Sequence, residues 1–302
     1  MVIWALGLLA ALAASLTMAT RTAALITANQ VENAQAEALA DAGVQLAMLD
    51  LGRTFAGILA VPPLAIDGTP RLCSLSGLGR LSIAVESETG KVDLNTATDA
   101  LLLRLIEGVG SRDIAASSVA DRILDFRDDD NLHRLNGAEA DTYRRANSAS
   151  VPKNAPFVAV EELGEVLGLS PALVAKLHPY VTVYSSSTGV DPRMAPIRLL
   201  GVLAGQSAAG LSGSSRLRPA FTSRDAATAA LPQGFLAAAA PHAFLIRSQA
   251  ETAAGARFVR EAIVDVQDRT AQRIAILRWY RGGSSGAELV QPAKTAPALP
   301  PC

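Results

Sequence analysis

The chain has 302 residues, half of them hydrophobic, and its 27 Lys and Arg residues nearly balance 28 Asp and Glu residues. This balance argues against a general nucleic-acid binder, which carries a basic surplus. The two cysteines, Cys73 and Cys302, exclude a disulfide-rich scaffold and a cysteine-based zinc site.

Much of the apolar character lies at the start of the chain. Residues 1–20 carry no charge, and the first charged side chain is Arg21. A helix of this length, at ~1.5 Å per residue, matches the ~30 Å hydrocarbon core of a bilayer. A cleaved secretory signal would carry a basic segment before its apolar run, and none precedes this one. The pattern therefore favours a membrane anchor over a cleaved signal, a buried soluble helix or a plain cytosolic enzyme.

The segment that follows continues the helix. Residues 21–51 contain no Pro and one Gly, and their apolar residues recur at helical spacing. We predict one unbroken helix, Val2–Leu51, about 75 Å long, whose second half lies on a globular domain. The stripe predicted to face that domain consists of Leu25, Ala28, Val31, Ala34, Ala38, Ala42, Leu46 and Leu49.

The middle of the chain is predicted to pass from loop to hairpin to helices. Pro and Gly are frequent in Gly57–Gly79, which predicts an irregular loop. Leu81–Glu86 alternates between apolar and polar residues and is followed by a turn, which predicts a hairpin. An α-rich block follows from about Asp93 to His178. Thr96 is expected to cap its first helix, and a second helix is expected from Ser111 to about Phe126.

The last third is predicted to be mainly β-structure. A helix near Ala195–Leu203 and a small-residue linker at Gly205–Ser215 precede it. Three strands are expected to form a meander: Ala243–Ser248, Ala256–Val266 and Arg273–Tyr280. Residues 282–302 are Pro-rich and aperiodic, which predicts a disordered tail.

Two segments of the α-block have the layout of a helix-hairpin-helix unit. Gly108–Gly110 joins the first two helices, and a looser copy joins Phe157–Leu167 to Pro171–Leu177. The backbone amides of such a turn can bind phosphate, so a membrane-anchored, competence-type DNA-binding protein is the alternative function. Seven acids against three Arg between Asp121 and Asp141 would repel phosphate. This excess favours a packing unit that binds no nucleic acid.

Acidic residues gather at the end of the second predicted helix. Asp125, Asp128 and Asp130 are followed by Glu139. Carboxylate oxygens are the ligands that Ca²⁺ prefers, and four carboxylates this close would repel one another without a cation. The acidic cluster therefore favours a divalent-ion site in this segment, of the kind that Ca²⁺ occupies.

The spacing from Asp128 to Glu139 is that of the first and twelfth positions of an EF-hand loop. Leu132 and His133 stand where an EF-hand has an oxygen ligand and its Gly, so a true EF-hand is not expected. The alternative to a metal site is a solvated acidic loop in which nearby arginines are the partners of the acids. These arginines are Arg127 and Arg134.

Catalytic patterns are weak. The chain has three histidines, and none lies in an HExxH motif or near a GxSxG motif. No P-loop or dinucleotide-binding motif follows a predicted strand. We therefore expect no enzymatic activity. Cys73 and Cys302 could pair in an oxidising compartment or stay as independent thiols; the sequence leaves both open.

Several segments together carry a resemblance to a known family. They are Ala36–Val44, Gly90–Ala97, Arg122–Asp130, Gly137–Tyr143, Pro152–Phe157, Glu161–Leu169 and Phe258–Val266. In these segments the chain resembles type II secretion system protein K, the large minor pseudopilin family. The family's basic leader ending in Gly does not match at the start of this sequence, and no acid precedes Glu32. The late first acid suits a subunit at the tip of the pseudopilus.

The resemblance implies an α+β pseudopilin fold. In this fold a long N-terminal transmembrane helix packs on a small antiparallel sheet, and a large all-α domain with helix-hairpin-helix-like units is inserted. The expected division is residues 1–20 in the membrane, 21–92 as pseudopilin helix and first strands, 93–180 as inserted domain, 181–281 as the remaining β-body and 282–302 as tail.

The resemblance also implies a function without catalysis. Minor pseudopilins I and J are the implied partners at the pseudopilus tip, together with inner-membrane lipid and secreted substrate proteins. The bulk of the chain would face the periplasm. Ca²⁺ bound by Asp125, Asp128, Asp130 and Glu139 is implied as well. The helix stripe with Leu25, Val31, Ala38 and Leu46 is the expected assembly interface.

Overall fold

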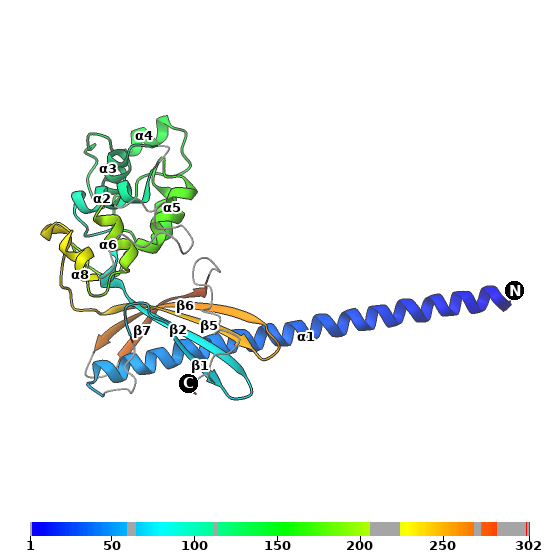
Figure 1. The fold of residues 1–302 in the computed structure, drawn as a ribbon. Coiled ribbons are helices and arrows are strands. Elements are labelled where there is room, and N and C mark those ends of the chain that lie inside the picture. Colours follow the sequence, from blue (N-terminus) through cyan, green and yellow to red (C-terminus); the bar gives the residue numbers. More distant parts are fainter. Residues whose placement is uncertain are drawn as a thin grey trace.

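The computed structural model describes residues 2–58, 65–111, 114–205, 224–268, 273–282, 300 and 302. A long helix, an antiparallel sheet that packs on its second half, and a separate helical domain above the sheet make up the structure (Figure 1). This arrangement confirms the predicted α+β class with a long N-terminal helix.

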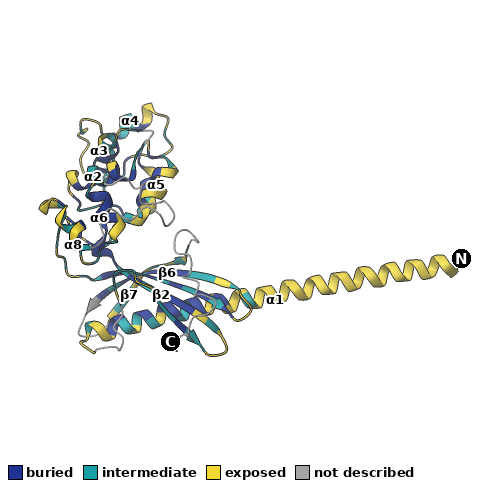
Figure 2. Ribbon diagram, in the orientation of Figure 1, coloured by how far each residue is buried: buried dark blue, intermediate teal, exposed yellow. Residues whose placement is uncertain are grey.

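The predicted long helix is confirmed. α1 spans Val2–Phe55, four residues beyond the predicted end, and its 54 residues extend over about 80 Å. Its first half stands free of the rest of the chain and is exposed (Figure 2). The most apolar window of α1 has a mean hydropathy of 2.1 and is 0% buried, which makes it a candidate membrane span by length and composition.

Five antiparallel strands form the sheet, in the order β1-β2-β5-β6-β7. Their bounds are Arg71–Leu75, Gly79–Ser87, Ala243–Thr252, Arg257–Asp268 and Arg273–Arg281. The predicted meander of the last three strands is confirmed. β1 lies within the segment predicted as loop, and it pairs with β2 across a tight turn that ends at Gly79.

The hairpin predicted after Leu81–Glu86 is wrong. Glu88–Gly90 forms a 3₁₀ turn, η1, that leads into the helical domain instead of reversing the strand. The Lys91 ammonium is buried there and donates to the Glu88 carboxylate at 2.7 Å. Because that pair fixes the exit direction, the chain continues to β3 (Val92–Asp93), which pairs in parallel with β4 (Val181–Thr182).

The face of α1 that packs on the sheet differs from the predicted one. The buried residues of α1 are Ala36, Leu39, Ala40, Gly43, Val44, Ala47, Leu51 and Gly52. They share one apolar core with Ile83, Phe244 and Val264. The prediction placed the stripe of Val31 and Ala38 on the sheet, but these residues lie on nearly the opposite side of the helix from Ala40 and Ala47, and Val31 is 50% exposed and Ala38 is exposed. Small residues of α1 such as Ala40 and Gly43 let the helix backbone approach the sheet closely. The size of the side chains therefore decides which face packs, in addition to their hydrophobicity.

Charged side chains hold the same helix in register. Arg260 of β6 is only 8% exposed, and its guanidinium contacts the carboxylates of Asp41 and Glu37, each at 2.6 Å. The Arg260 guanidinium also lies over the Trp279 ring at 5.3 Å. A buried cation with two carboxylate partners and an aromatic face is well compensated. These contacts fix the position of α1 along the sheet.

The helical domain has its own core. Its helices are α2 (Asp99–Val109), α3 (Ala116–Arg127), α4 (Ala140–Arg145), α5 (Pro171–Leu177), α6 (Ile197–Leu203) and α8 (Arg224–Ala229). Short 3₁₀ turns stand between them: η2 (Val160–Glu165), η3 (His178–Tyr180) and η4 (Gln233–Phe235). The predicted start of α5 is confirmed, because the Ser170 hydroxyl caps it.

Other boundaries in this domain differ from the predictions. Thr98, not Thr96, caps α2 by accepting from the Leu101 N–H; the Thr96 hydroxyl instead donates to the Ser187 carbonyl. α3 begins at Ala116 rather than Ser111. The segment predicted as a helix at Phe157–Leu167 forms only η2, since its Gly lowers helix propensity.

The helical domain extends beyond its predicted end at residue 180. Leu199, Val202 and Leu231 belong to the same core as α2 and α3, and α6 packs so closely on α2 that a Cβ at Gly108 would lie 2.5 Å from Val202. The described residues of 181–205 and 224–236, assigned by prediction to the β-body, therefore belong mainly with the helices.

A disulfide joins Cys73 of β1 to Cys302. This pairing settles the choice that the sequence left open. The expected linker at Gly205–Ser215 lies outside the described residues apart from Gly205. The expected tail lies outside them apart from Gly282, Pro300 and Cys302.

Candidate functional site

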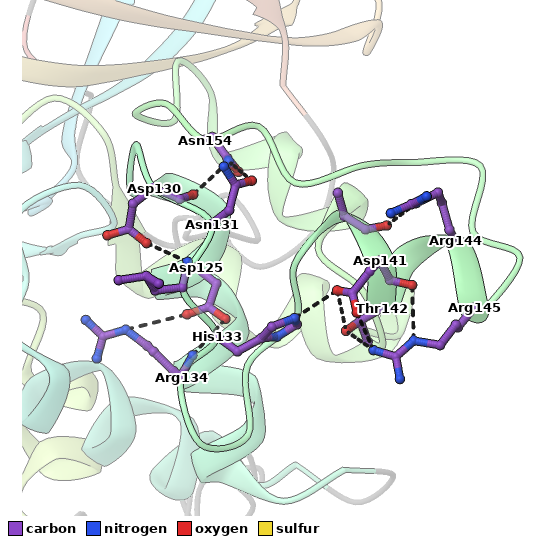
Figure 3. Close-up of polar contacts among 12 residues, drawn as sticks. Asp125, Asp130, Asn131, His133, Arg134, Asp141, Thr142, Arg144, Arg145 and Asn154 are labelled. Carbon is purple, nitrogen blue, oxygen red and sulfur yellow. Dashed lines mark hydrogen bonds and ion pairs between the residues drawn. The ribbon is translucent and has the colours of Figure 1, made fainter.

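The acidic loop, residues 128–139, connects α3 to α4 (Figure 3). Asp125 lies in the last turn of α3, Asp128 caps the end of that helix, and Glu139 directly precedes α4. The C-terminal end of a helix carries a partial negative charge and favours cations. Carboxylates placed there need a positive partner.

Three of the four predicted ligands come together. Asp128, Asp130 and Glu139 each offer a carboxylate oxygen, and these oxygens lie within 4.8 Å of one another. Asp125 lies next to this group, in the interior of the domain: it is 0% exposed, and a Cβ at Gly137 would lie 1.9 Å from its Oδ2. Gly at position 137 therefore lets the loop pass over the Asp125 carboxylate.

Several of these oxygens are buried without a hydrogen-bond partner among the described residues. They are Asp125 Oδ1, Asp128 Oδ1 and both carboxylate oxygens of Glu139. A buried carboxylate without a donor is costly. Buried oxygens without a donor are not expected in a solvated acidic loop. Carboxylate oxygens of this kind are the ligands that a hard divalent cation prefers.

Burial and mutual repulsion raise the pKa of these carboxyls. Burial raises the pKa of Asp128, and the Asp130 charge raises it further. The pKa of Glu139 is raised by burial and by the charges of Asp125 and Asp128. Burial also raises the pKa of Asp125, with a smaller contribution from Asp128. Without a cation, the cluster therefore opposes folding at neutral pH.

The two arginines proposed as partners balance the cluster only in part. Arg127 turns away and donates to the backbone carbonyls of Leu94 and Ala97. The Arg134 guanidinium pairs with Asp99 at 2.7 Å and approaches Asp125 only to 3.6 Å. Arg127 thus holds the segment before α2, and Arg134 links Asp99 of α2 to Asp125.

One residue of the site was not singled out from the sequence. Asn154 donates its side-chain amide to the Asp130 carbonyl at 2.8 Å and to the Asn131 side chain at 3.1 Å. Its own Oδ1 is buried without a hydrogen-bond partner among the described residues, and its backbone has a positive φ of 49°. An amide oxygen is a Ca²⁺ ligand type, but Asn154 is 24 residues from Asp130, so spacing could not reveal it.

The predicted assembly stripe lies on the outside of α1. Leu25 is 66% exposed, Val31 is 50% exposed, and Ala38 is exposed, whereas Leu46 is half-buried. The stripe is therefore free of the sheet over most of its length. An exposed apolar stripe on a long helix is typical of an interaction surface.

The first predicted hairpin joins α2 to α3. α2 and α3 pack against each other across Gly110, whose φ is 74°. The ammonium of Lys176 is hydrogen-bonded to the Gly110 carbonyl at 3.0 Å. Residues 112–113 of the turn lie outside the described residues.

Comparison with known proteins links the chain to one secretion system. Residues 78–186 match the family model for type II secretion system (T2SS), protein K. Type II secretion system protein K from Klebsiella pneumoniae is 33% identical over 88 residues. The aligned part spans 29% of this chain and 27% of that relative, so it covers only about a quarter of the relative's length.

A solved structure shares the fold over most of the chain. It is the crystal structure of the GspK-GspI-GspJ complex from the enterotoxigenic Escherichia coli type 2 secretion system. The match has a TM-score of 0.60 at 17% identity and covers 85% of this chain and 99% of the matched chain. The resemblance stated from the sequence is therefore confirmed, because residues 78–186 match the family model for type II secretion system protein K and the fold of the solved structure matches over most of the chain.

Proposed function

We propose that the chain is a structural minor pseudopilin at the tip of the type II secretion pseudopilus. There it primes assembly and supports the export of folded proteins across the outer membrane. The observation that carries this proposal is α1, because an apolar, wholly exposed first half continues without a break into a second half packed on the sheet. One rigid helix can thus connect lipid to a protein assembly.

The proposed partners are minor pseudopilins I and J and, at the tip, secreted substrate proteins. The chain shares its fold with a chain of a complex that contains GspI and GspJ. The outward stripe with Leu25, Val31, Ala38 and Leu46 is the surface we assign to this assembly, since it remains accessible over most of its length. Co-purification with both partners tests the assignment.

The proposed location is the inner membrane, with a single span and the bulk of the chain in the periplasm. The Cys73–Cys302 disulfide supports this side of the membrane, since such bonds persist in oxidising compartments. We also propose that the role is structural rather than catalytic. Binding of DNA by the helical domain is disfavoured by the acidic cluster beside α3.

We further propose that the acidic loop binds Ca²⁺. Asp128, Asp130 and Glu139 would hold the ion, and the buried Asp125 would support them from the end of α3. The orphaned oxygens support this assignment. When bound, the ion would supply positive charge beyond what Arg134 provides through its ion pair with Asp125, and it would tie α3 to α4.

Calcium is expected to raise the melting temperature of the full chain in detergent micelles at pH 7. The double substitution Asp128→Asn and Glu139→Gln should abolish that shift. Asp129→Asn is the matched control, because Asp129 is an exposed acid of the same loop outside the cluster. Equal increases in melting temperature in the wild type and the double variant would contradict a calcium site at these residues.

The increase in melting temperature caused by calcium should also depend on pH. The carboxyls of the cluster have raised pKa values. In the absence of ion, the repulsion among them is therefore relieved as the pH falls through these raised values and is fully present above them. Protons compete with the ion for the same oxygens. The calcium-induced shift should accordingly be largest at neutral pH and vanish in mild acid, and a constant shift would contradict the assignment.

A further inference from the structure

The outer edge of β1 is occupied by residues from the far end of the sequence. β1 is the first strand in the sheet order, and β2 pairs with one side of it. On the other side, the Ser74 N–H donates to the Pro300 carbonyl at 2.8 Å, and the Cys302 N–H donates to the Ser74 carbonyl at 3.1 Å. Figure 1 shows this end of the chain beside β1.

These two hydrogen bonds have the pattern of a parallel strand pair centred on Ser74. They use the N–H and the C=O of Ser74 that β2 does not use. A bare strand edge presents such groups to other chains and is a template for strand addition. Pro300 and Cys302, here called the clasp, fill that template.

The clasp is also held covalently. Cys302 is bonded to Cys73, whose side chain is 2% exposed and lies in the core between α1 and the sheet. The clasp thus combines two backbone hydrogen bonds on the strand edge with one bond anchored in the core. The sheet in the described residues has β7 at its opposite edge.

We propose that the clasp is a redox-dependent closure of the β1 edge, which prevents a strand of a second copy of this chain from pairing there. The closure forms when the Cys73 and Cys302 thiols give two electrons and two protons to a disulfide of a thiol oxidoreductase. That disulfide is reduced to a dithiol, and the Cys73–Cys302 bond forms. Reduction by a dithiol reverses the reaction and frees the β1 edge.

The test uses the full oxidised chain in detergent micelles. Two quantities are measured: amide hydrogen exchange in residues 71–75 and the molecular mass by light scattering. In Cys302→Ser, exchange at Ser74 should be faster by about tenfold or more, because its N–H loses a fixed acceptor. The mass should rise with concentration as copies pair through β1. Dithiothreitol should produce the same changes in the wild type.

A second variant separates edge pairing from simple misfolding. The double variant carries Cys302→Ser and Ser74→Pro. Proline removes the backbone N–H at position 74. That N–H bonds to Pro300 and not to β2, so the pairing of β1 with β2 should be kept. This double variant should remain at the mass of the oxidised wild type. Unchanged exchange at Ser74 in Cys302→Ser would overturn the clasp. Faster exchange without any rise in mass, or association that Ser74→Pro leaves intact, would overturn its role in blocking strand pairing.

Discussion

Phe126→Ala should destabilise the helical domain by about 3–5 kcal/mol, the usual cost of deleting a buried aromatic ring. Phe126 is 0% exposed, and its ring stacks on Phe157 with centroids 5.0 Å apart. In the sequence, Phe126 lies between Asp125, which is buried, and Asp128, which caps the end of α3. The same change should therefore weaken calcium binding, because the helix end would no longer be fixed.

Denaturant unfolding followed by circular dichroism measures this loss. Val158→Ala is the matched control, since Val158 is an apolar residue of the same domain with 66% exposure, and its truncation should cost less than about 0.5 kcal/mol. Phe126→Leu should fall between the two. A stability of Phe126→Ala within error of Val158→Ala would contradict the core assigned to α3.

Gly43→Leu should cost about 3 kcal/mol or more by overpacking the contact between α1 and the sheet. A Cβ at Gly43 would already lie 2.1 Å from the Ser248 hydroxyl oxygen and 3.1 Å from its Cβ. The longer Leu side chain has no room there. Since α1 would be displaced from β5, the variant should also expose the apolar core shared by helix and sheet.

Gly164→Leu serves as the control, because nothing lies within 4 Å of a Cβ at Gly164. A smaller change tests the same contact more finely. Gly43→Ala should be destabilising alone and partly rescued by Ser248→Ala, which removes a buried hydroxyl without a hydrogen-bond partner among the described residues. Additive effects of the two substitutions would show that the residues do not touch.

Hydrophobic pattern was sufficient to predict α1 and the last three strands, because long periodic segments carry strong signals. It was not sufficient to orient α1. An Ala-rich helix is apolar on several faces, and the face that packs was decided by small residues such as Gly43 and Ala47 and by the Arg260 contacts with Glu37 and Asp41. Those partners are more than 200 residues apart in the chain, as their separations of 219 and 223 show.

The acidic loop was predictable from the density of carboxylates, whereas its burial was not. Only the structure shows that Asp125 is fully buried and that the Arg127 guanidinium donates hydrogen bonds to backbone carbonyls instead of to the acids of the loop. Asn154 comes from a distant loop. The extent of the helical domain was also missed, since α6 and α8 join its core only through tertiary packing.

The outward stripe of α1 is proposed to assemble with minor pseudopilins I and J. The direct measurement is size-exclusion chromatography with light scattering of the full chain co-expressed with both partners in detergent. Three versions should be compared: the wild type, Val31→Arg with Ala38→Arg, and the control Asn33→Arg. Asn33 is exposed and lies on nearly the opposite side of the helix from Val31, two residues away.

We predict that the wild type and Asn33→Arg elute in one peak with both partners. The doubly charged stripe variant should elute without them while keeping the wild-type melting temperature. Elution of the wild type alone, or assembly of the stripe variant as complete as that of the wild type, would contradict this prediction.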